Sequence, residues 1–186
     1  MFKIKIPVVG PVRAGKTAIS NFLADAGDSI GTEYIPTIGC RILEMEQETK
    51  ISNRKEKFEI ELWDCSGDLK YESCWTALSH DANGVVFAFN PYEANHSKEL
   101  NQWFTHFVQN SGIREECCLI IENRYETETG TPNAGKLGNL FDGIKKIKSN
   151  MENESEKFRD EFNNFIQSVA AFSKSKQDQE EKMILR

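Results

Sequence analysis

Gly10-Pro11-Val12-Arg13-Ala14-Gly15-Lys16-Thr17 is an eight-residue run that fits the pattern G-x-x-x-x-G-K-[S/T] of a phosphate-binding loop. Before it, residues 2–9 alternate between polar and apolar side chains and then turn apolar, which is typical of a strand entering a buried sheet. The run therefore lies between a predicted strand and a predicted helix, which is the context that the motif requires. The apolar residues that predict this helix by their spacing are Ala18, Ile19, Phe22, Leu23 and Ala26.

The residue types of this loop suit phosphate chemistry. Gly10 and Gly15 allow a tight turn and a close approach of the backbone to a ligand. Successive N–H groups can then point at phosphate oxygens, aided by the positive end of the following helix. Lys16 can reach the outer phosphates of a nucleotide, and Thr17 can offer its hydroxyl to Mg²⁺. The alternative is an ordinary strand–helix turn with an exposed lysine, and the flanking patterns favour the nucleotide site over it.

Length and charge restrict the remaining possibilities. The chain has 186 residues, which suits one domain; we assign residues 1–172 to it and residues 173–186 to a polar C-terminal tail that is frayed or disordered. The net charge of −6 argues against general nucleic-acid binding and against a basic membrane-binding patch. No transmembrane helix is expected, because the sequence has no apolar run long enough to span a bilayer.

The chain has five cysteines, an odd number without the spacing of a disulfide framework. This favours reduced thiols in a cytosolic protein, and the lack of a C-x-x-C pair argues against a zinc site. Cys117 and Cys118 lie in an apolar run and are expected in the core. No cysteine follows Cys118, so we expect no prenyl anchor, and any membrane association would come through a partner.

Strand and helix patterns alternate along the chain, which predicts a parallel-rich sheet with helices on both faces. Residues 27–39 are expected to form a loop, residues 53–56 a turn within a hairpin at one side of the sheet, and residues 123–140 a long loop with at most a short helix. The predicted strands are residues 2–9, 40–46, 58–64, 85–89, 117–121 and 144–148, and further helices carry the apolar residues of segments 100–108 and 158–172.

A second group of candidate residues surrounds the second and third predicted strands. Asp64 ends the third strand, at the edge where open α/β sheets bind ligands, and can hold Mg²⁺, usually through water. Gly67 follows with an N–H that can meet a γ-phosphate. Thr37 precedes the second strand and can complete the Mg²⁺ shell only when the third phosphate is present. A loop held in this way would be ordered by GTP and released by its loss.

Together these residues resemble the small Ras/Rab-type GTPases over residues 2–172, with Thr37-Ile38-Gly39 similar to switch I and Trp63-Asp64-Cys65-Ser66-Gly67 similar to the start of switch II. The resemblance implies an α/β P-loop small-GTPase fold, with a mostly parallel central sheet of about six strands, helices on both faces, and a fourth helix that is short or missing. It also implies bound GTP or GDP with Mg²⁺. The residues implied to bind the nucleotide are Gly10, Val12, Arg13, Ala14, Gly15, Lys16, Thr17, Ala18, Thr37, Gly67, Asn123, Arg124 and Glu126, and those implied to hold the metal are Thr17, Thr37 and Asp64.

Several runs are more similar still to a Rab-like branch of this family that acts in intraflagellar transport. This resemblance implies a GTP-binding subunit of intraflagellar transport complex B, required for assembly of a cilium or flagellum and docked on coiled-coil subunits of that complex. It also implies a location in the cytoplasm and in the cilium or flagellum and its base. The runs that carry it are Ser20–Leu23, Thr37–Glu44, Glu61–Asp68 and Glu72–Trp75.

Three positions depart from an ordinary member of the family. Asp68 stands directly after the D-x-x-G motif, where a glutamine normally orients the attacking water. Because an ionised carboxylate repels the γ-phosphate and cannot donate a hydrogen bond, we expect very weak or absent hydrolysis and assign no catalytic residue. Val12 can crowd the space of a glutamine or of an incoming arginine. Arg13 is either a solvated side chain, which is the simpler interpretation, or an internal charge clamp.

The segment expected to recognise the base is Asn123-Arg124-Tyr125-Glu126, in place of the usual N-K-x-D. Arg124 can stack on a ring, and Glu126 can accept two hydrogen bonds from a guanine. The alternative is a polar loop entrance without base contact. Ser149-Asn150-Met151 is at best a weak match to the loop that normally completes the base site. A preference for guanine therefore follows mainly from the family resemblance.

Other candidates carry weaker signals. His80, His96 and His106 are scattered, without a metal-like pairing, and are expected at the surface or at helix edges. Trp75 is expected either to pack or, because it lies in the predicted switch II, to form an exposed anchor for a partner. Three functions stay open: a nucleotide-loaded interaction module, a cycling GTPase that needs an activating protein, and a P-loop kinase, for which segment 123–140 has too few arginines.

Overall fold

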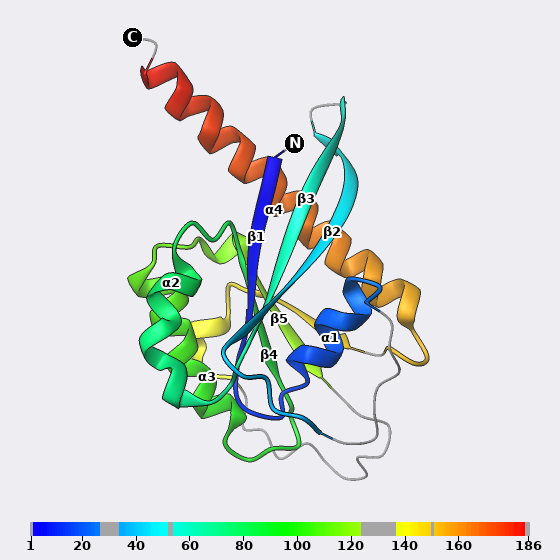
Figure 1. Ribbon diagram of the computed structural model, residues 1–186, viewed down its shortest axis with the longest axis vertical. Coiled ribbons are helices and arrows are strands. Elements are labelled where there is room, and N and C mark those ends of the chain that lie inside the picture. The colour runs from blue at the N-terminus through cyan, green and yellow to red at the C-terminus, as the bar shows by residue number, and fades with distance from the viewer. Residues whose placement is uncertain (1, 27–33, 52–53, 124–136, 150, 185–186) are drawn as a thin grey trace.

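Within the residues that the structure describes, six strands form one sheet in the order β2-β3-β1-β4-β5-β6 (Figure 1). The structure, a computed structural model, describes residues 2–26, 34–51, 54–123, 137–149 and 151–184. β2 and β3 pair antiparallel and the other neighbours pair parallel, which confirms the predicted mostly parallel sheet. The strands are β1 (Phe2–Val9), β2 (Cys40–Ile51), β3 (Arg54–Cys65), β4 (Val85–Phe89), β5 (Cys118–Asn123) and β6 (Lys145–Ser149).

Helices cover both faces of this sheet, as the alternation of patterns predicted. Two of them, α1 and α4, lie on one side, and α2 and α3 lie on the other (Figure 1). None of the described helices combines the length and the apolar character that spanning a membrane requires. The helices are α1 (Lys16–Leu23), α2 (Trp75–Ser79), α3 (His96–Phe104), which a π-helical turn at Thr105–Asn110 continues, and α4 (Ser155–Ile184); 3₁₀ turns occupy Leu69–Cys74, Glu115–Cys117 and Asn139–Phe141.

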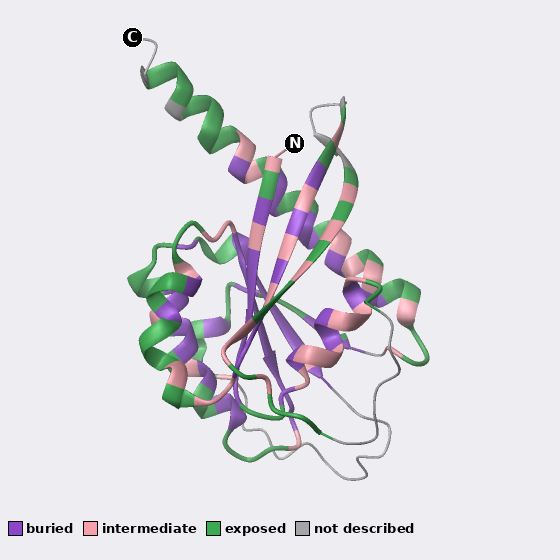
Figure 2. Ribbon diagram, viewed as in Figure 1, coloured by how far each residue is buried: buried purple, intermediate pink, exposed green. Residues whose placement is uncertain are grey.

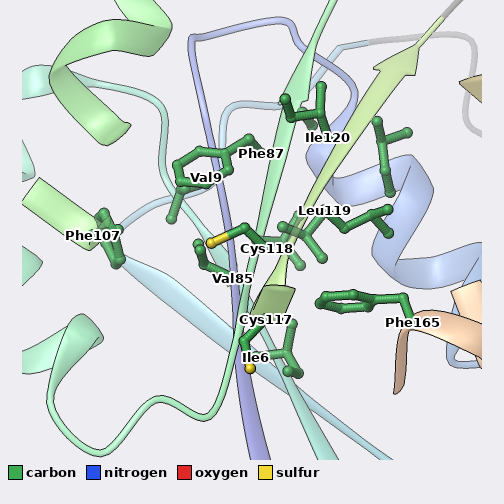
Figure 3. Close-up of a cluster of buried hydrophobic side chains, with 14 of the residues drawn as sticks. Ile6, Val9, Val85, Phe87, Phe107, Cys117, Cys118, Leu119, Ile120 and Phe165 are labelled. Atoms are coloured by element: carbon green, nitrogen blue, oxygen red, sulfur yellow. The ribbon is translucent and has the colours of Figure 1, made fainter. Parts of the chain in front are cut away.

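The core lies between the sheet and these two helix layers (Figure 2). β4 is buried along its whole length, as expected for a continuous apolar run that is covered on both faces. Figure 3 shows Phe107 and Phe165 on opposite sides of a cluster that contains Cys118 and Leu119 of β5. Cys117 and Cys118 are both buried free thiols, which confirms their predicted place in the core.

The hairpin of β2 and β3 is longer than predicted. Its pairing extends to Ile51 opposite Arg54, so the turn expected at residues 53–56 is wrong from Arg54 onward, where β3 begins. The charged residues of this segment suggested a turn. They are compatible with a strand because an exposed hairpin accepts opposite charges across its strands, and Lys55 Nζ lies 3.7 Å from Glu48 Oε1.

Trp75 belongs to the core, and the interpretation of this residue as an exposed anchor is wrong. It begins α2 and is only 2% exposed. Its ring centroid lies 4.0 Å from that of Trp103 in α3 and 6.1 Å from that of Phe107. Aromatic pairs of this kind contribute about 0.5–1.5 kcal/mol beyond the burial of their area. The contact therefore joins α2 to α3 on one face of the sheet.

The last helix, α4, continues past the predicted end of the domain. Ser173 is still buried and its Oγ accepts a hydrogen bond from Asn83 Nδ2 at 3.2 Å, and Lys174 contacts Glu56 of β3. The prediction of a frayed or disordered segment is therefore wrong for residues 173–184, which are helical because these long-range contacts extend the helix from the core. The division of the chain into a domain and a tail stays a prediction. The apolar face of α4 that reaches the core consists of Phe158, Phe162, Phe165, Ile166, Val169 and Ala170.

The segment between β5 and β6 was expected to be a long loop with at most a short helix. Residues 124–136 of it lie outside the described residues. In the described part, the 3₁₀ turn Asn139–Phe141 precedes β6, and the Phe141 ring packs edge-on against Phe104 at 5.0 Å. The parallel strands β1, β3, β4, β5 and β6 end at the same edge of the sheet, and the candidate site lies along this edge (Figure 1).

Candidate nucleotide-binding site

The phosphate loop, residues 10–17, connects β1 to α1 at the carboxyl edge of the sheet. Gly10 has a φ of 139°, and a Cβ at this position would lie 2.1 Å from the backbone oxygen of Ala88 in β4. Gly15 has a φ of 82° and stands at the start of α1 in the left-handed conformation. Both positions therefore need glycine, the first because of the neighbouring strand and the second because of its backbone conformation.

Lys16 is folded back onto this loop and is 5% exposed. Its Nζ donates hydrogen bonds to the backbone oxygens of Gly10 at 2.9 Å and Pro11 at 2.6 Å. Burial lowers the pKa of its ammonium to about 8, and the nearby Asp64 carboxylate opposes this effect. Because charged phosphate oxygens are stronger acceptors than backbone carbonyls, a polyphosphate is a suitable ligand for this buried cation.

Thr17, Thr37 and Asp64, the three residues expected to hold a metal, come together beside the loop. Thr17 Oγ1 lies 2.9 Å from Thr37 Oγ1 and donates a hydrogen bond to Asp64 Oδ2 at 2.9 Å. Asp64 is fully buried, and its Oδ1 has no hydrogen-bond partner among the described residues. A buried carboxylate oxygen without a partner needs a cation or a water, and these hydroxyl and carboxylate oxygens are of the type that Mg²⁺ prefers. The residues present therefore fit Mg²⁺.

Arg41 adds a cation to this cluster that our sequence interpretation did not single out. Its Nη2 lies 3.3 Å from Asp64 Oδ2 and 2.5 Å from Asn21 Oδ1. Burial raises the pKa of the Asp64 carboxyl, whereas the hydrogen bond from Thr17 and the charge of Arg41 oppose the rise. Arg41 stands directly opposite Asp64 in the hairpin. Counting residues along the two predicted strands from the predicted switch segments would have placed Arg41 opposite Asp64. This register is therefore the signal that could have identified Arg41 from the sequence.

Gly67 lies against the phosphate loop. A Cβ at this position would lie 2.5 Å from the backbone of Pro11 and 2.5 Å from that of Val12, so no other residue fits without a shift. The backbone of Gly67 thus lies directly beside the loop. Thr37 approaches through its contact with Thr17, so both predicted switch segments reach the phosphate loop.

Asp68, Arg13 and Val12 are the three positions that depart from an ordinary member of the family. The side chains of the first two contact neighbouring residues. The Asp68 carboxylate accepts a hydrogen bond from the backbone N–H of Lys70 at 3.0 Å and lies 2.8 Å from Lys70 Nζ, so it caps the following 3₁₀ turn. Arg13 is exposed, and its guanidinium lies 5.5 Å from the ring centroid of Tyr34. Val12 is 40% exposed and borders an open cleft of about 490 Å³ that Gly67 also lines.

Asn123, at the end of β5, is fully buried and connects three parts of the site. Its Nδ2 donates to the backbone oxygen of Ala14 at 3.2 Å, and its Oδ1 accepts a hydrogen bond from Ser149 Oγ at the end of β6. Ser149 is the first residue of the segment that only weakly matches the loop that normally completes the base site. It is therefore part of this arrangement. Arg124 and Glu126, the residues expected to contact the base, lie outside the described residues.

His96 begins α3, a helix-edge position as predicted, but it is buried rather than exposed. Its Nδ1 accepts a hydrogen bond from the backbone N–H of Asn90 at 3.1 Å, and the side chain also bonds to the backbone of Val12. Burial lowers the pKa of its imidazole, which favours the neutral form. His96 therefore links the start of α3 to the phosphate loop, a role that no sequence motif indicates.

Comparison with known proteins identifies the class of protein to which this chain belongs. A family model described as Ras of Complex, Roc, domain of DAPkinase matches residues 5–126. The fold and this match together define a Ras-like small GTPase domain. Over the whole length of both sequences, the chain is 41% identical to the intraflagellar transport protein 22 homolog of Danio rerio and 39% identical to that of Homo sapiens. The chain therefore belongs to the intraflagellar transport protein 22 family.

Solved structures from T. brucei have the same fold. The crystal structure of intraflagellar transport proteins 22, 74 and 81 with GTP bound has a TM-score of 0.72 and 25% identity, covering 94% of this chain and 99% of that chain. The crystal structure of GDP-bound intraflagellar transport protein 22 has a TM-score of 0.68 and 24% identity, covering 92% of this chain and 98% of that chain. These findings confirm the predicted family and the predicted fold class of a mostly parallel six-stranded sheet with helices. The fourth helix expected to be short or missing falls within segment 123–140, most of which lies outside the described residues, so that part stays a prediction.

Proposed function

We propose that this chain is a GTP-binding subunit of intraflagellar transport complex B, a nucleotide-loaded interaction module required for assembly of a cilium or flagellum. The observation that carries the proposal is the contact of Thr17 with both Thr37 and Asp64, because it joins the phosphate loop to both predicted switch segments. The GTP-bound structures of the T. brucei relative support the choice of nucleotide. The proposed location is the cytoplasm and the cilium or flagellum and its base.

In this proposal each part of the site has a role. Lys16 binds the outer phosphates, and Thr17, Thr37 and Asp64 hold Mg²⁺, which neutralises phosphate charge when it is bound. The backbone N–H of Gly67 meets the γ-phosphate. The remaining proposed contacts are the loop and helix residues Gly10, Val12, Arg13, Ala14, Gly15 and Ala18 around the phosphates, and Asn123, Arg124 and Glu126 at the base.

Hydrolysis in this proposal is very slow or absent. Asp68 replaces the glutamine that positions water, and its carboxylate is held by Lys70. The alternative is a cycling GTPase whose activating protein supplies the missing groups. The open cleft beside Val12 and Gly67 favours this alternative, because it has room for a side chain from a partner.

The ligand carried by freshly purified protein tests the two functions. We expect GTP to be retained through purification and to be identified by mass spectrometry after denaturation. GDP in its place would favour the cycling GTPase, and a protein that is empty and does not bind added GTP would contradict both functions. Competition of GTP against ATP then tests the base site, where equal affinities would remove the assignment to guanine.

The partner proposed for this module is the pair of coiled-coil subunits that the family resemblance implies. The crystal structure of the T. brucei relative together with intraflagellar transport proteins 74 and 81 supports it. A docking surface at the switch segments is favoured by exposed apolar side chains next to Thr37, since Ile35 is 78% exposed and Ile38 is 82% exposed. GTP would hold this segment through Thr37 and so present the surface.

Two variants test the docking surface. Ile38→Asp should weaken binding to the coiled-coil pair by at least about tenfold without loss of nucleotide, because it places a charge in the centre of an apolar contact. Met183→Asp is the matched control, since Met183 is also 78% exposed but lies at the far end of α4. Lys16→Ala should weaken nucleotide and partner binding together. Unchanged partner binding in a nucleotide-free Lys16→Ala protein would show that docking is independent of the nucleotide.

A further inference from the structure

Cys40 and Cys65 are free thiols that face each other across the hairpin, with 3.9 Å between their Sγ atoms. They are paired residues in the register of β2 and β3. The adjacent pair, Gly39 and Ser66, has the hydrogen bond, since Ser66 N–H donates to Gly39 O at 2.8 Å. Because hydrogen-bonded and non-hydrogen-bonded pairs alternate, Cys40 and Cys65 form a non-hydrogen-bonded pair, in which Cα atoms are about 4.5 Å apart.

That arrangement is within reach of a disulfide. Disulfides join residues whose Cα atoms are about 4.4–6.8 Å apart, so the backbone does not need to separate or approach. The two sulfurs need to move only from 3.9 Å to a bond length of about 2 Å, which rotation about the side chains can supply. The two thiols also differ in access, because Cys40 is half-buried whereas Cys65 is buried and bonds through Sγ to the backbone oxygen of Trp63 at 3.1 Å.

We propose that Cys40 and Cys65 form a reversible disulfide under oxidation by a peroxide. The more accessible Cys40 thiol reacts first: hydrogen peroxide oxidises it to a sulfenic acid, and one water leaves. The Cys65 thiol then attacks the sulfenic sulfur, the S–S bond forms, and the second water carries away the thiol proton and the hydroxyl group. Two thiols are oxidised and one peroxide is reduced to two waters, and a thiol reductant reverses the bond.

The position of this pair connects it to the nucleotide site. Cys65 directly follows Asp64 and stands two residues before Gly67, and Cys40 follows Thr37 by three residues. A covalent bond between them would link the two predicted switch segments at the point where both meet the β2–β3 hairpin. The effect inferred for the nucleotide rests on the proposed function: the cross-linked protein releases its nucleotide more slowly, because opening of the site needs these segments to move apart.

Peptide mapping tests the bond itself. The purified full-length chain is treated with hydrogen peroxide, its free thiols are blocked, and it is digested with trypsin without reductant. Cys40, Cys65 and Cys74 fall in different peptides, residues 17–41, 58–70 and 71–98. We expect a linked species of the first two peptides that dithiothreitol removes. The exposed Cys74 is the control, so Cys74→Ser should leave the link unchanged. A free Cys65 beside an over-oxidised Cys40, or a link that involves Cys74, would overturn the proposal.

Release of a fluorescent GDP tests the consequence. We expect peroxide to slow release by at least about fivefold, within the range of ordinary coupling between sites. Cys40→Val fills the half-buried position without a thiol and should lose the response to peroxide while it keeps the reduced rate. A mapped disulfide with an unchanged release rate would overturn the regulatory effect. Failure to bind any nucleotide would contradict the proposed function, and the peptide map would still decide whether the disulfide forms.

Discussion

Arg41 and Asp64 stand directly opposite each other in the β2–β3 hairpin, and their side chains meet with 3.3 Å between Nη2 and Oδ2. Asp64 is fully buried, so its charge needs compensation where water is excluded. The guanidinium of Arg41 supplies part of it at the carboxylate that we propose to hold Mg²⁺. Arg41 therefore gives this carboxylate a cationic neighbour from the protein itself.

Removal of Arg41 should destabilise the nucleotide-free protein. Because the Arg41 side chain is itself 45% exposed, we expect Arg41→Ala to lower the free energy of unfolding by only about 1 kcal/mol. Mg²⁺ should raise the free energy of unfolding more in this variant than in the wild type, because the Asp64 carboxylate has lost the Arg41 guanidinium as a partner. Urea unfolding with and without Mg²⁺ measures both effects. Lys157→Ala, which breaks the exposed pair with Glu154, is the control and should show neither; an Arg41→Ala protein with wild-type behaviour would contradict the prediction.

Nucleotide affinity should depend on pH through Lys16. Burial lowers the pKa of Lys16 to about 8, and the negative charge of bound phosphates would raise it. Above pH 8 the free protein has lost a proton that the complex keeps, so affinity falls as pH rises, by at most roughly tenfold per pH unit. Below pH 8 this group is protonated in both states and has no effect.

Titration with fluorescent GDP between pH 7 and pH 9 measures how steeply the affinity changes with pH. Lys16→Arg, which stays protonated, should bind with a flat profile, and an equal slope in both proteins would assign the effect to another group.

Asn123 should contribute to stability as well as to the site. Asn123→Ala leaves Ala14 O and Ser149 Oγ without their partner in a buried place, which costs about 1–3 kcal/mol. Equilibrium unfolding in urea measures the change. Asn164→Ala on the exposed side of α4 is the matched control and should change stability by less than about 0.5 kcal/mol. Equal effects of the two substitutions would show that the Asn123 bonds contribute little.

Hydrolysis should respond to a change at Asp68. Asp68→Gln restores an uncharged side chain that can donate to and accept from water, and should raise the single-turnover rate by at least about tenfold, below the usual contribution of a positioned catalytic group. Asp68→Asn removes the same charge with a shorter amide and separates the effect of charge from that of reach. If Asp68→Gln is no faster than the wild type, the slow rate has another cause, and Val12 is then the next residue to test.

Trp75 should behave as a core residue. Trp75→Ala removes the partner of the Trp103 ring and should lower the free energy of unfolding by about 3–5 kcal/mol. Trp75→Phe keeps an aromatic ring and should cost less, so it remains measurable if the alanine variant does not fold. Leu69 lies in the same segment and is 47% exposed, so Leu69→Ala should cost less than about 0.5 kcal/mol. A small cost for Trp75→Ala would contradict the packing seen here.

Local patterns were sufficient for the elements around the phosphate loop. The glycine spacing at Gly10 and Gly15 predicted the loop before α1, and the apolar run at Val85–Phe89 predicted a strand that is buried along its whole length. The same reasoning was wrong where distant contacts decide the outcome. The polar segment after Phe172 looked disordered, yet contacts to Asn83 and Glu56 keep it helical. For Trp75 the sequence left packing and an exposed anchor both open, and only the contact with Trp103 decides for packing.

The amino-acid sequence alone was sufficient to predict a phosphate loop between a strand and a helix, a mostly parallel sheet, and hydroxyl and carboxylate groups at Thr17, Thr37 and Asp64 as candidate metal ligands. These features follow from residue types and spacing within short segments. Only the tertiary structure decided that Arg41 meets Asp64, that Asn123 holds the phosphate loop, and that Cys40 faces Cys65. The physical reason is register: which side chains face each other depends on how whole strands and helices pack, and no short segment of sequence contains that information.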